Sequence, residues 1–261
     1  MAIDLERQGK VATIILSRPE VRNALDRETA AELFEAFQRF EENEELSVAV
    51  LWGQGGHFCA GADLRAIAHG RPNVLSEGMS EPGPMGPTRM RLSKPVIAAI
   101  SGYAVAGGLE LALWCDLRVA EIGSVLGVFN RRFGVPLIDG GTYRLPRIVG
   151  MGRALDMILT GRSVEAKEAL QIGLVDRLVE KGDARVRAEE LACEIAAFPQ
   201  ACLRSDREAV YGGLGLPYEQ AMEREFALGL RVIQAGWAQK GAAEFLEGQE
   251  KRRTKTSKPE G

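Results

Sequence analysis

The sequence predicts a layered α/β domain followed by a helical region. Short apolar segments rich in β-branched residues, at residues 11–16, 46–52 and 95–100, have the composition of buried strands. A helical pattern lies between the first two, and strand–helix–strand order is typical of a sheet covered by helices. From about residue 150 onward the pattern becomes purely helical. The chain therefore passes from a mixed part to a helix-only part.

Each element has its own local signal. The first strand is bounded by Gly9 and Pro19, and Asp26 is a good N-cap for the helix that follows, in which apolar residues recur on one face. The other elements expected are a helix at 109–114, a strand at 117–120, and helices at 153–160, 163–173, 184–197 and 217–248, the last with a break near Gly236.

Residues 66–93 are rich in glycine and proline and show little periodicity. Such a segment is either an ordinary surface loop or a mobile lid or wall of a substrate site, because long loops between functional segments often bind ligands. The sequence leaves both interpretations open.

Charge and composition argue against several classes of function. The net charge is −3, whereas a nucleic-acid-binding surface needs an excess of clustered Lys and Arg. The four cysteines show no C-x-x-C pair and no neighbouring histidine cluster, so neither a zinc site nor a disulfide framework is indicated. The sequence shows no signal-peptide pattern and no apolar run of ~20 residues, which predicts a cytoplasmic protein without a membrane partner.

Two glycine-containing segments follow predicted strands, HFCAGADL at 57–64 and GYAVAGGLELA at 102–112. A turn of this kind before a helix points unpaired backbone N–H groups outward at the positive end of the helix dipole. Two such turns side by side would form an oxyanion hole, although a single glycine turn usually serves packing. Neither segment has the Gly-Lys-Ser/Thr ending of a phosphate-binding P-loop.

Glu110 lies in an otherwise apolar helix start, from Leu109 to Trp114. An acidic residue in the first turn complements the helix dipole, which explains it without a catalytic role. If its neighbours are buried, desolvation raises the pKa of the carboxyl while the dipole lowers it, and such a group suits proton transfer. Both interpretations remain open for the residue taken alone.

Several segments together resemble the enoyl-CoA hydratase/isomerase (crotonase) superfamily, and they occur in the same order and at similar spacing as in that family. They are RPEVRNAL near the N-terminus, CAGADL, KPVIAAISGYAVAGGLELALWCDLRVA, the GGT-x-RLPR-x-VG run at 140–150, and LTGRSVEAKEALQIGLVD at 159–176. The resemblance implies an α/β fold, a spiral of β-β-α units with a C-terminal all-helical trimerisation region. The expected parts are a spiral core at 1–195 with the CoA and active site, a helical region at 196–250, and a polar, disordered tail at 251–261.

The resemblance also implies roles for individual residues. The backbone N–H groups of Ala62 and Gly107 would form an oxyanion hole for a thioester oxygen, and Glu110 would be one of two catalytic carboxylates. The CoA-binding residues that it implies are Val21, Arg22, Ala24, Ala60, Asp63 and Leu64. It implies no metal and no redox cofactor, since CoA arrives as part of the substrate. The expected partners are an acyl-CoA thioester and further copies of the chain, as a homotrimer or a dimer of trimers.

One position departs from the family hydratases. They carry a second glutamate about twenty residues after the first, and here that residue is Asn130, which cannot act as a general acid or base. Asp139, just before Gly140-Gly141-Thr142, resembles the acidic residue of the dienoyl-CoA isomerases and is the expected substitute. A purely structural role, as a turn residue capping a helix that starts near Thr142, is the alternative.

The expected reaction is the hydration of a 2-enoyl-CoA to a 3-hydroxyacyl-CoA. Glu110 and Asp139 would move protons around an enolate that Ala62 and Gly107 stabilise. The first alternative is an enoyl- or dienoyl-CoA double-bond isomerase that uses the same two carboxylates. The second is a non-catalytic acyl-CoA-binding member of the superfamily, which Asn130 keeps open.

Overall fold

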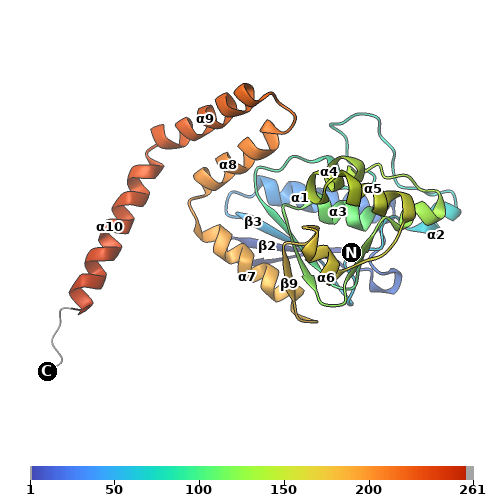
Figure 1. Cartoon of the computed structure of the whole chain (residues 1–261). Coiled ribbons are helices and arrows are strands. Elements are labelled where there is room, and N and C mark those ends of the chain that lie inside the picture. The colour runs from blue at the N-terminus through green and yellow to red at the C-terminus, as the bar shows by residue number, and fades with distance from the viewer. Residues whose placement is uncertain (1, 257–261) are drawn as a thin grey trace. The chain divides into compact units, whose positions relative to one another are not determined.

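The chain forms two compact units that meet in sequence between Ala196 and Ala197. The computed structural model describes residues 2–256, and the side chains of residues 2–247 (Figure 1). The first unit contains every strand of the described chain, and the second is helical. No helix in this part of the chain is both long and apolar enough to cross a membrane.

The larger sheet of the first unit is mostly parallel. Its strands, in spatial order, are β1 (Ile3–Gln8), β2 (Val11–Leu16), β3 (Val48–Gly53), β4 (Val96–Ile100), β6 (Leu117–Glu121) and β9 (Arg177–Val179). Only β1 runs antiparallel to its neighbour, because it forms a hairpin with β2 through Gly9, which has a φ of 58°. Parallel neighbours need long crossover connections, and here helices supply several of them.

The strands of a second, smaller sheet lie between strands of the large sheet along the chain. It contains β5 (Tyr103–Val105), β7 (Val125–Gly127) and β8 (Val164–Glu165). Single bridges extend this layer, between Cys59 and Ala104 and between Leu25 and Ala62. A strand of the large sheet is thus followed by a short paired segment and then a helix, as in β4, β5 and α3 (Gly107–Trp114). This order is the β-β-α repeat that the resemblance implies.

The other helical segments of the first unit connect or cover the strands. They are η1 (Pro19–Val21), α1 (Arg27–Glu42), α2 (Leu64–Ala68), η2 (Pro87–Arg89), η3 (Phe129–Phe133), α4 (Gly141–Val149), α5 (Met151–Thr160), α6 (Ala166–Gln171) and α7 (Ala184–Ala197). The Asp26 side chain accepts a hydrogen bond from the Thr29 N–H at 2.9 Å, so α1 begins at the predicted N-cap.

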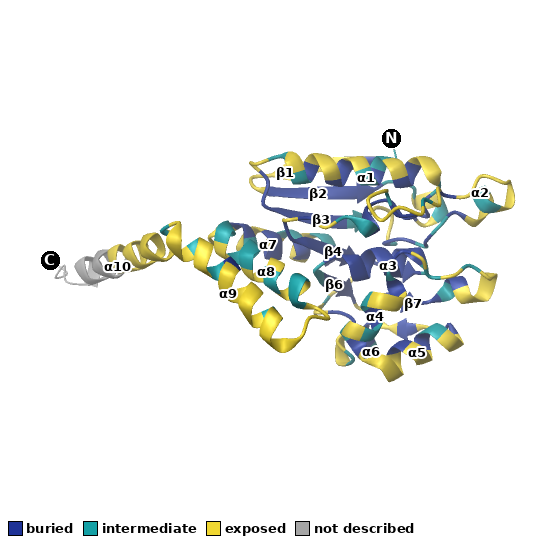
Figure 2. Ribbon diagram, turned by 90° about the horizontal axis from the view of Figure 1, so that it is seen from above, coloured by how far each residue is buried: buried dark blue, intermediate teal, exposed yellow. Residues whose placement is uncertain are grey.

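The central strands of the large sheet, β2, β3 and β4, are buried on both faces. Ala12, Ile14 and Leu16 of β2 belong to one apolar cluster with side chains of α1 and α3, whereas Val11 belongs to a second cluster that includes side chains of α7. Because side chains alternate along a strand, a strand covered on both faces is an unbroken apolar run. Figure 2 shows β2 and the whole of α3 as buried, so α3 is a central element of this core.

The second unit consists of α8 (Gln200–Gly213), α9 (Tyr218–Gln234) and α10 (Trp237–Thr256). The ion pair between Arg224 and Glu208, at 2.9 Å, joins α8 and α9. Large apolar side chains nevertheless stay exposed here, among them Tyr218 and Phe226. Residues 251–256 are helical, contrary to the disordered tail predicted for 251–261, and residues 257–261 lie outside the described part of the chain.

Several predicted elements need correction. The chain is not purely helical after residue 150, because β8 and β9 follow, and the helix expected at 163–173 is divided into β8 and the shorter α6. These strands are two or three residues long and pair only with distant partners, so they leave no run of alternating residues in the sequence. β1 and α8 were not expected from the sequence at all.

Candidate active site

The two glycine-containing turns lie side by side. The Cys59 N–H donates to the Tyr103 carbonyl at 2.9 Å, and the Val105 N–H donates to the Cys59 carbonyl at 3.1 Å. A Cβ atom on Gly61 would lie 2.9 Å from the Gly107 nitrogen, so the two main chains are in contact there. Backbone pairing therefore brings together two segments that are far apart in the sequence.

The N–H groups of Ala62 and Gly107 are left unpaired by this arrangement. Leu25 binds the residues on either side of Ala62, since its N–H donates to the Gly61 carbonyl and its carbonyl accepts from the Asp63 N–H. Gly107 is the first residue of α3, where no carbonyl of the preceding helical turn is available. Across the described chain neither N–H donates a backbone hydrogen bond, and both residues line the same cavity.

The backbone of the second turn has an unusual conformation. Ala106 has a φ of 54° and a ψ of −126°, a region that residues with a Cβ seldom adopt and that costs roughly 1–3 kcal/mol. Gly108 packs against the Cys59 carbonyl with no room for a Cβ, and a Cβ on Gly107 would lie 2.7 Å from the Met85 sulfur. Close packing therefore fixes the direction in which the Gly107 N–H group points.

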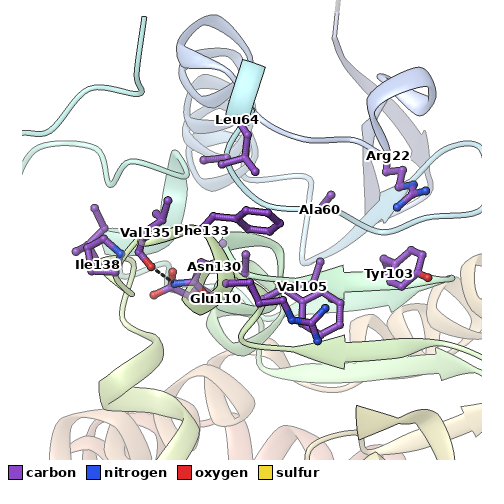
Figure 3. A pocket seen from close by; sticks show the side chains of 16 residues that line it. Arg22, Ala60, Leu64, Tyr103, Val105, Glu110, Asn130, Phe133, Val135 and Ile138 are labelled. Carbon is purple, nitrogen blue, oxygen red and sulfur yellow. Dashed lines mark hydrogen bonds between the residues drawn. The ribbon is translucent and has the colours of Figure 1, made fainter. Parts of the chain in front are cut away.

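The cavity next to these turns has a volume of about 440 Å³. Figure 3 shows Arg22 and Tyr103 at one end, and Glu110, Asn130 and Ile138 toward the other. Ala62 and Gly107 also belong to its lining. A long ligand with one reactive carbonyl group fits such an arrangement, because the polar groups that would act on it are few and lie in an otherwise apolar wall.

Glu110 lines the cavity and is only 2% exposed. Its Oε1 accepts hydrogen bonds from the N–H groups of Asp139, at 2.9 Å, and Gly141, at 2.8 Å. Burial and, to a smaller extent, the negative charge of Asp139 raise the pKa of Glu110 to about 7. Both bonds fall on Oε1 in the described chain, which leaves Oε2 for a substrate. A carboxyl with this pKa can take up and release a proton near neutral pH.

Asp139 contacts Glu110 through its backbone N–H, and it is not one of the residues that line the cavity. Its Oδ1 accepts hydrogen bonds from the Met85 N–H, at 3.0 Å, and from the Thr88 hydroxyl. Burial raises the pKa of Asp139 above its usual range, although the bond from Thr88 opposes this. The structure thus brings the two predicted carboxylates together, but the hydrogen bonds of the Asp139 side chain come from Met85 and Thr88, and its charge acts on Glu110.

Asn130, the position at which the resemblance implies a second glutamate, lines the cavity toward the same end as Glu110. It is 5% exposed, and its Nδ2 donates to the Val135 carbonyl at 2.8 Å. The dashed line in Figure 3 marks this bond. Since the side chain is uncharged and buried, it can position a ligand but cannot exchange a proton with it.

The residues predicted to bind CoA divide into two groups. Arg22, Ala60 and Leu64 line the cavity. Val21, Ala24 and Asp63 do not; Asp63 caps α2 through Oδ1, which accepts from the Arg65 N–H at 2.9 Å. The guanidinium of Arg22 lies 5.2 Å from the centre of the Tyr103 ring, which makes a flat surface at this end.

Other lining residues were not predicted from the sequence. They include Tyr103, Phe129, Arg132, Phe133, Val135 and Ile138. Nothing in the local pattern marks them, because the segment from 129 to 138 has no regular period and its place is set by η3. Residues 66–93 contribute no side chain to the described lining, although the Met85 side chain packs against Gly107. Within the described residues no group of three or more His, Cys, Asp or Glu side chains could hold a metal ion.

Comparison with known proteins shows the family of the chain. The sequence model of the enoyl-CoA hydratase/isomerase family matches residues 6–255. The chain is 34% identical over 254 residues to the enoyl-CoA hydratase EchA19 of Mycobacterium tuberculosis, with 93% of this chain and 92% of that protein covered. It is 35% identical over 226 residues to a short-chain-enoyl-CoA hydratase of Clostridium acetobutylicum, with 85% of both covered.

A solved structure shows the same fold. The enoyl-CoA hydratase EchA1 of Mycobacterium marinum superimposes with a TM-score of 0.88 at 32% identity, and the match covers 95% of this chain and 96% of that one. The predicted crotonase-like α/β fold with a helical C-terminal region is therefore confirmed. From its sequence motifs, its fold and these relatives, the chain belongs to the enoyl-CoA hydratase/isomerase family.

Proposed function

We propose that this chain is a hydratase that adds water to a 2-enoyl-CoA thioester and gives a 3-hydroxyacyl-CoA. The observation that carries the proposal is the pairing of two unpaired N–H groups, on Ala62 and Gly107, with a carboxyl of raised pKa in one cavity. The N–H pair would bind the thioester oxygen and stabilise the negative charge that develops on it. The relatives named as hydratases support the same reaction.

The reaction balances with Glu110 as the only group that exchanges protons. The water oxygen forms a bond to Cβ, and one water proton moves to Glu110 Oε2. The π electrons of the double bond shift toward Cα, so that the thioester becomes an enolate whose oxygen the two N–H groups hold. Glu110 then returns the proton to Cα. The carboxylate is ionised at the start and at the end, and the chemistry uses neither a metal nor a redox cofactor.

Asp139 would support this reaction through Glu110. Its N–H donates to Glu110 Oε1, and its charge helps to keep the Glu110 pKa close to 7. A direct proton transfer by Asp139 was the prediction from the sequence. The position of Asp139 outside the cavity lining, with Oδ1 bound to Met85 and Thr88, supports the indirect role better.

The substrate would lie with CoA at the end of the cavity that contains Arg22 and Ala60, and with its acyl chain toward Asn130 and Ile138. The exposed apolar side chains of α8 and α9 are suited to contacts between subunits, which supports a trimer or a dimer of trimers. Light scattering coupled to gel filtration would measure that assembly, and a monomeric mass would contradict it.

The reaction is tested with three substrates and one variant. Crotonyl-CoA, a 3-enoyl-CoA and a dienoyl-CoA are incubated separately with the protein. Mass spectrometry detects added water, and chromatography against standards separates the double-bond isomers, which have equal mass. Crotonyl-CoA is expected to gain one water. Glu110→Gln should lower kcat by at least about 100-fold, since it removes general acid–base catalysis, while CoA-ester binding persists because the amide oxygen still accepts the two N–H bonds.

The other outcomes identify the alternatives. A shifted double bond without added water would show an isomerase. Binding of acyl-CoA without turnover of any of the three esters would show a binding protein. Unchanged turnover in Glu110→Gln would remove that residue from the mechanism.

A further inference from the structure

Asn130 has a hydrogen-bond acceptor that no group of the described chain satisfies. The side chain is 5% exposed, and its Nδ2 donates to the Val135 carbonyl at 2.8 Å. Only the amide nitrogen can donate to a carbonyl, so this bond fixes which end of the side chain is oxygen. The remaining atom, Oδ1, is buried and receives no hydrogen bond from the described residues.

A buried acceptor without a donor is rare in native proteins and usually marks a place where a ligand or a water binds. Asn130 lines the cavity that contains Glu110, and Figure 3 shows both at the same end. Glu110 must be ionised to begin hydration, and an ionised carboxylate only accepts hydrogen bonds. Glu110 in that state has no proton to donate to Asn130 Oδ1, so an ordered water or a bound substrate would supply the donor.

We propose that Asn130 Oδ1 accepts a hydrogen bond from the oxygen that adds to Cβ, an inference that rests on the proposed hydratase function. The attacking water donates one hydrogen to Asn130 and the other to Glu110 Oε2, so that a lone pair of its oxygen faces Cβ. In the product, the 3-hydroxyl group donates to the same Oδ1. Asn130 thus holds the water with a neutral acceptor where family hydratases have a carboxylate, and it exchanges no proton.

The test compares two ligands that differ by one hydroxyl group, 3-hydroxybutyryl-CoA and butyryl-CoA. Dissociation constants are measured by calorimetry in the Glu110→Gln protein, in which turnover is suppressed, and in the same protein with Asn130→Ala or Asn130→Asp added. Both additional substitutions remove the donor to Val135, but only Asn130→Ala also removes the acceptor. The preference for the hydroxy ligand over butyryl-CoA is compared within each variant, so that effects of charge and volume common to both ligands cancel and the acceptor at residue 130 is tested. Thermal unfolding checks that each variant folds.

The hydroxy ligand is expected to bind about five- to tenfold more tightly than butyryl-CoA when residue 130 is Asn, which corresponds to one neutral hydrogen bond. The preference should be at least as large when residue 130 is Asp, because a carboxylate accepts a charge-assisted bond. This preference should vanish in Asn130→Ala. An equal loss in both variants, or a preference that survives Asn130→Ala, would overturn the inference while leaving the hydratase proposal intact. Failure of both CoA esters to bind any of the proteins would overturn the proposed function and this inference together.

Discussion

The two turns that supply the N–H groups are held in place by different means. The first, residues 59–63, leads into α2, a short helix without a buried residue, and the Asp63 side chain caps it. The second, residues 104–108, leads into α3, in which every residue is buried and no side chain caps the start. Polar contacts therefore hold the first turn, and close packing holds the second.

This difference explains where the reactive group is found. A carboxyl on the buried helix loses its water, and Glu110 consequently has a pKa of about 7. The first turn ends at the surface, where Leu64 is 43% exposed, and its role in the proposed site is limited to one N–H group and a wall of the cavity. Similar glycine patterns in the sequence thus lead to unequal parts of one site.

The largest effect is expected from adding one methyl group to the packed turn. In Gly108→Ala the new Cβ would overlap the Cys59 carbonyl, which is backbone and cannot move aside alone. We expect a loss of about 3 kcal/mol or more in the free energy of unfolding, measured by urea denaturation, together with a loss of hydratase activity.

The matched control is Gly152→Ala, also in a helix, where a Cβ would meet nothing within 4 Å. It should leave the stability unchanged or raise it by about 0.5 kcal/mol, through helix propensity. If Gly108→Ala were as stable as this control, the packing account of the second turn would be wrong.

A smaller effect is expected in the polar turn. Asp63→Ala removes the cap of α2 and also the ion pair with Arg18, which lies 3.1 Å away, and should cost about 2 kcal/mol. Asp63→Asn keeps an acceptor for the Arg65 N–H and should cost less than about 1 kcal/mol. Equal losses in the two variants, by urea denaturation, would show that the charge matters more than the cap.

The smallest effect is a shift in pH dependence. Hydration requires ionised Glu110, so kcat/KM should fall as the pH drops below about 7. Asp139→Asn removes a negative charge that raises this pKa, and the midpoint should therefore move to lower pH by up to about one unit. The Asn side chain retains an oxygen for Met85 and Thr88, so the local structure should persist.

The pH profile is measured in both directions of the reaction. Hydration consumes no net proton, so the equilibrium constant is independent of pH and dehydration must show the same profile in kcat/KM. Glu180→Gln, which removes an exposed carboxylate, is the control and should leave the midpoint in place. A nearly complete loss of turnover in Asp139→Asn would instead support the direct proton transfer that the sequence predicted.

Local sequence determined most of the regular elements of the first unit. The mainly apolar runs at β2, β3 and β4 and the Asp26 cap of α1 each depend on neighbouring residues, and such signals are readable along the chain. The motifs around Ala62 and Gly107 were also recognisable, because the tight turns that expose a backbone N–H group require glycine or another small residue at particular positions.

Tertiary structure alone decided the chemistry of these groups. The contact between the two turns, the burial that raises the Glu110 pKa, and the position of Asp139 behind Glu110 all join residues that are far apart in sequence. The unpaired oxygen of Asn130 also depends on folding, because the amide of Asn130 meets the nearby Val135 carbonyl while its oxygen meets no donor of the described chain. A carboxyl or amide acquires its pKa and its unpaired atoms from the water and neighbours that folding removes or supplies, and no local pattern records them.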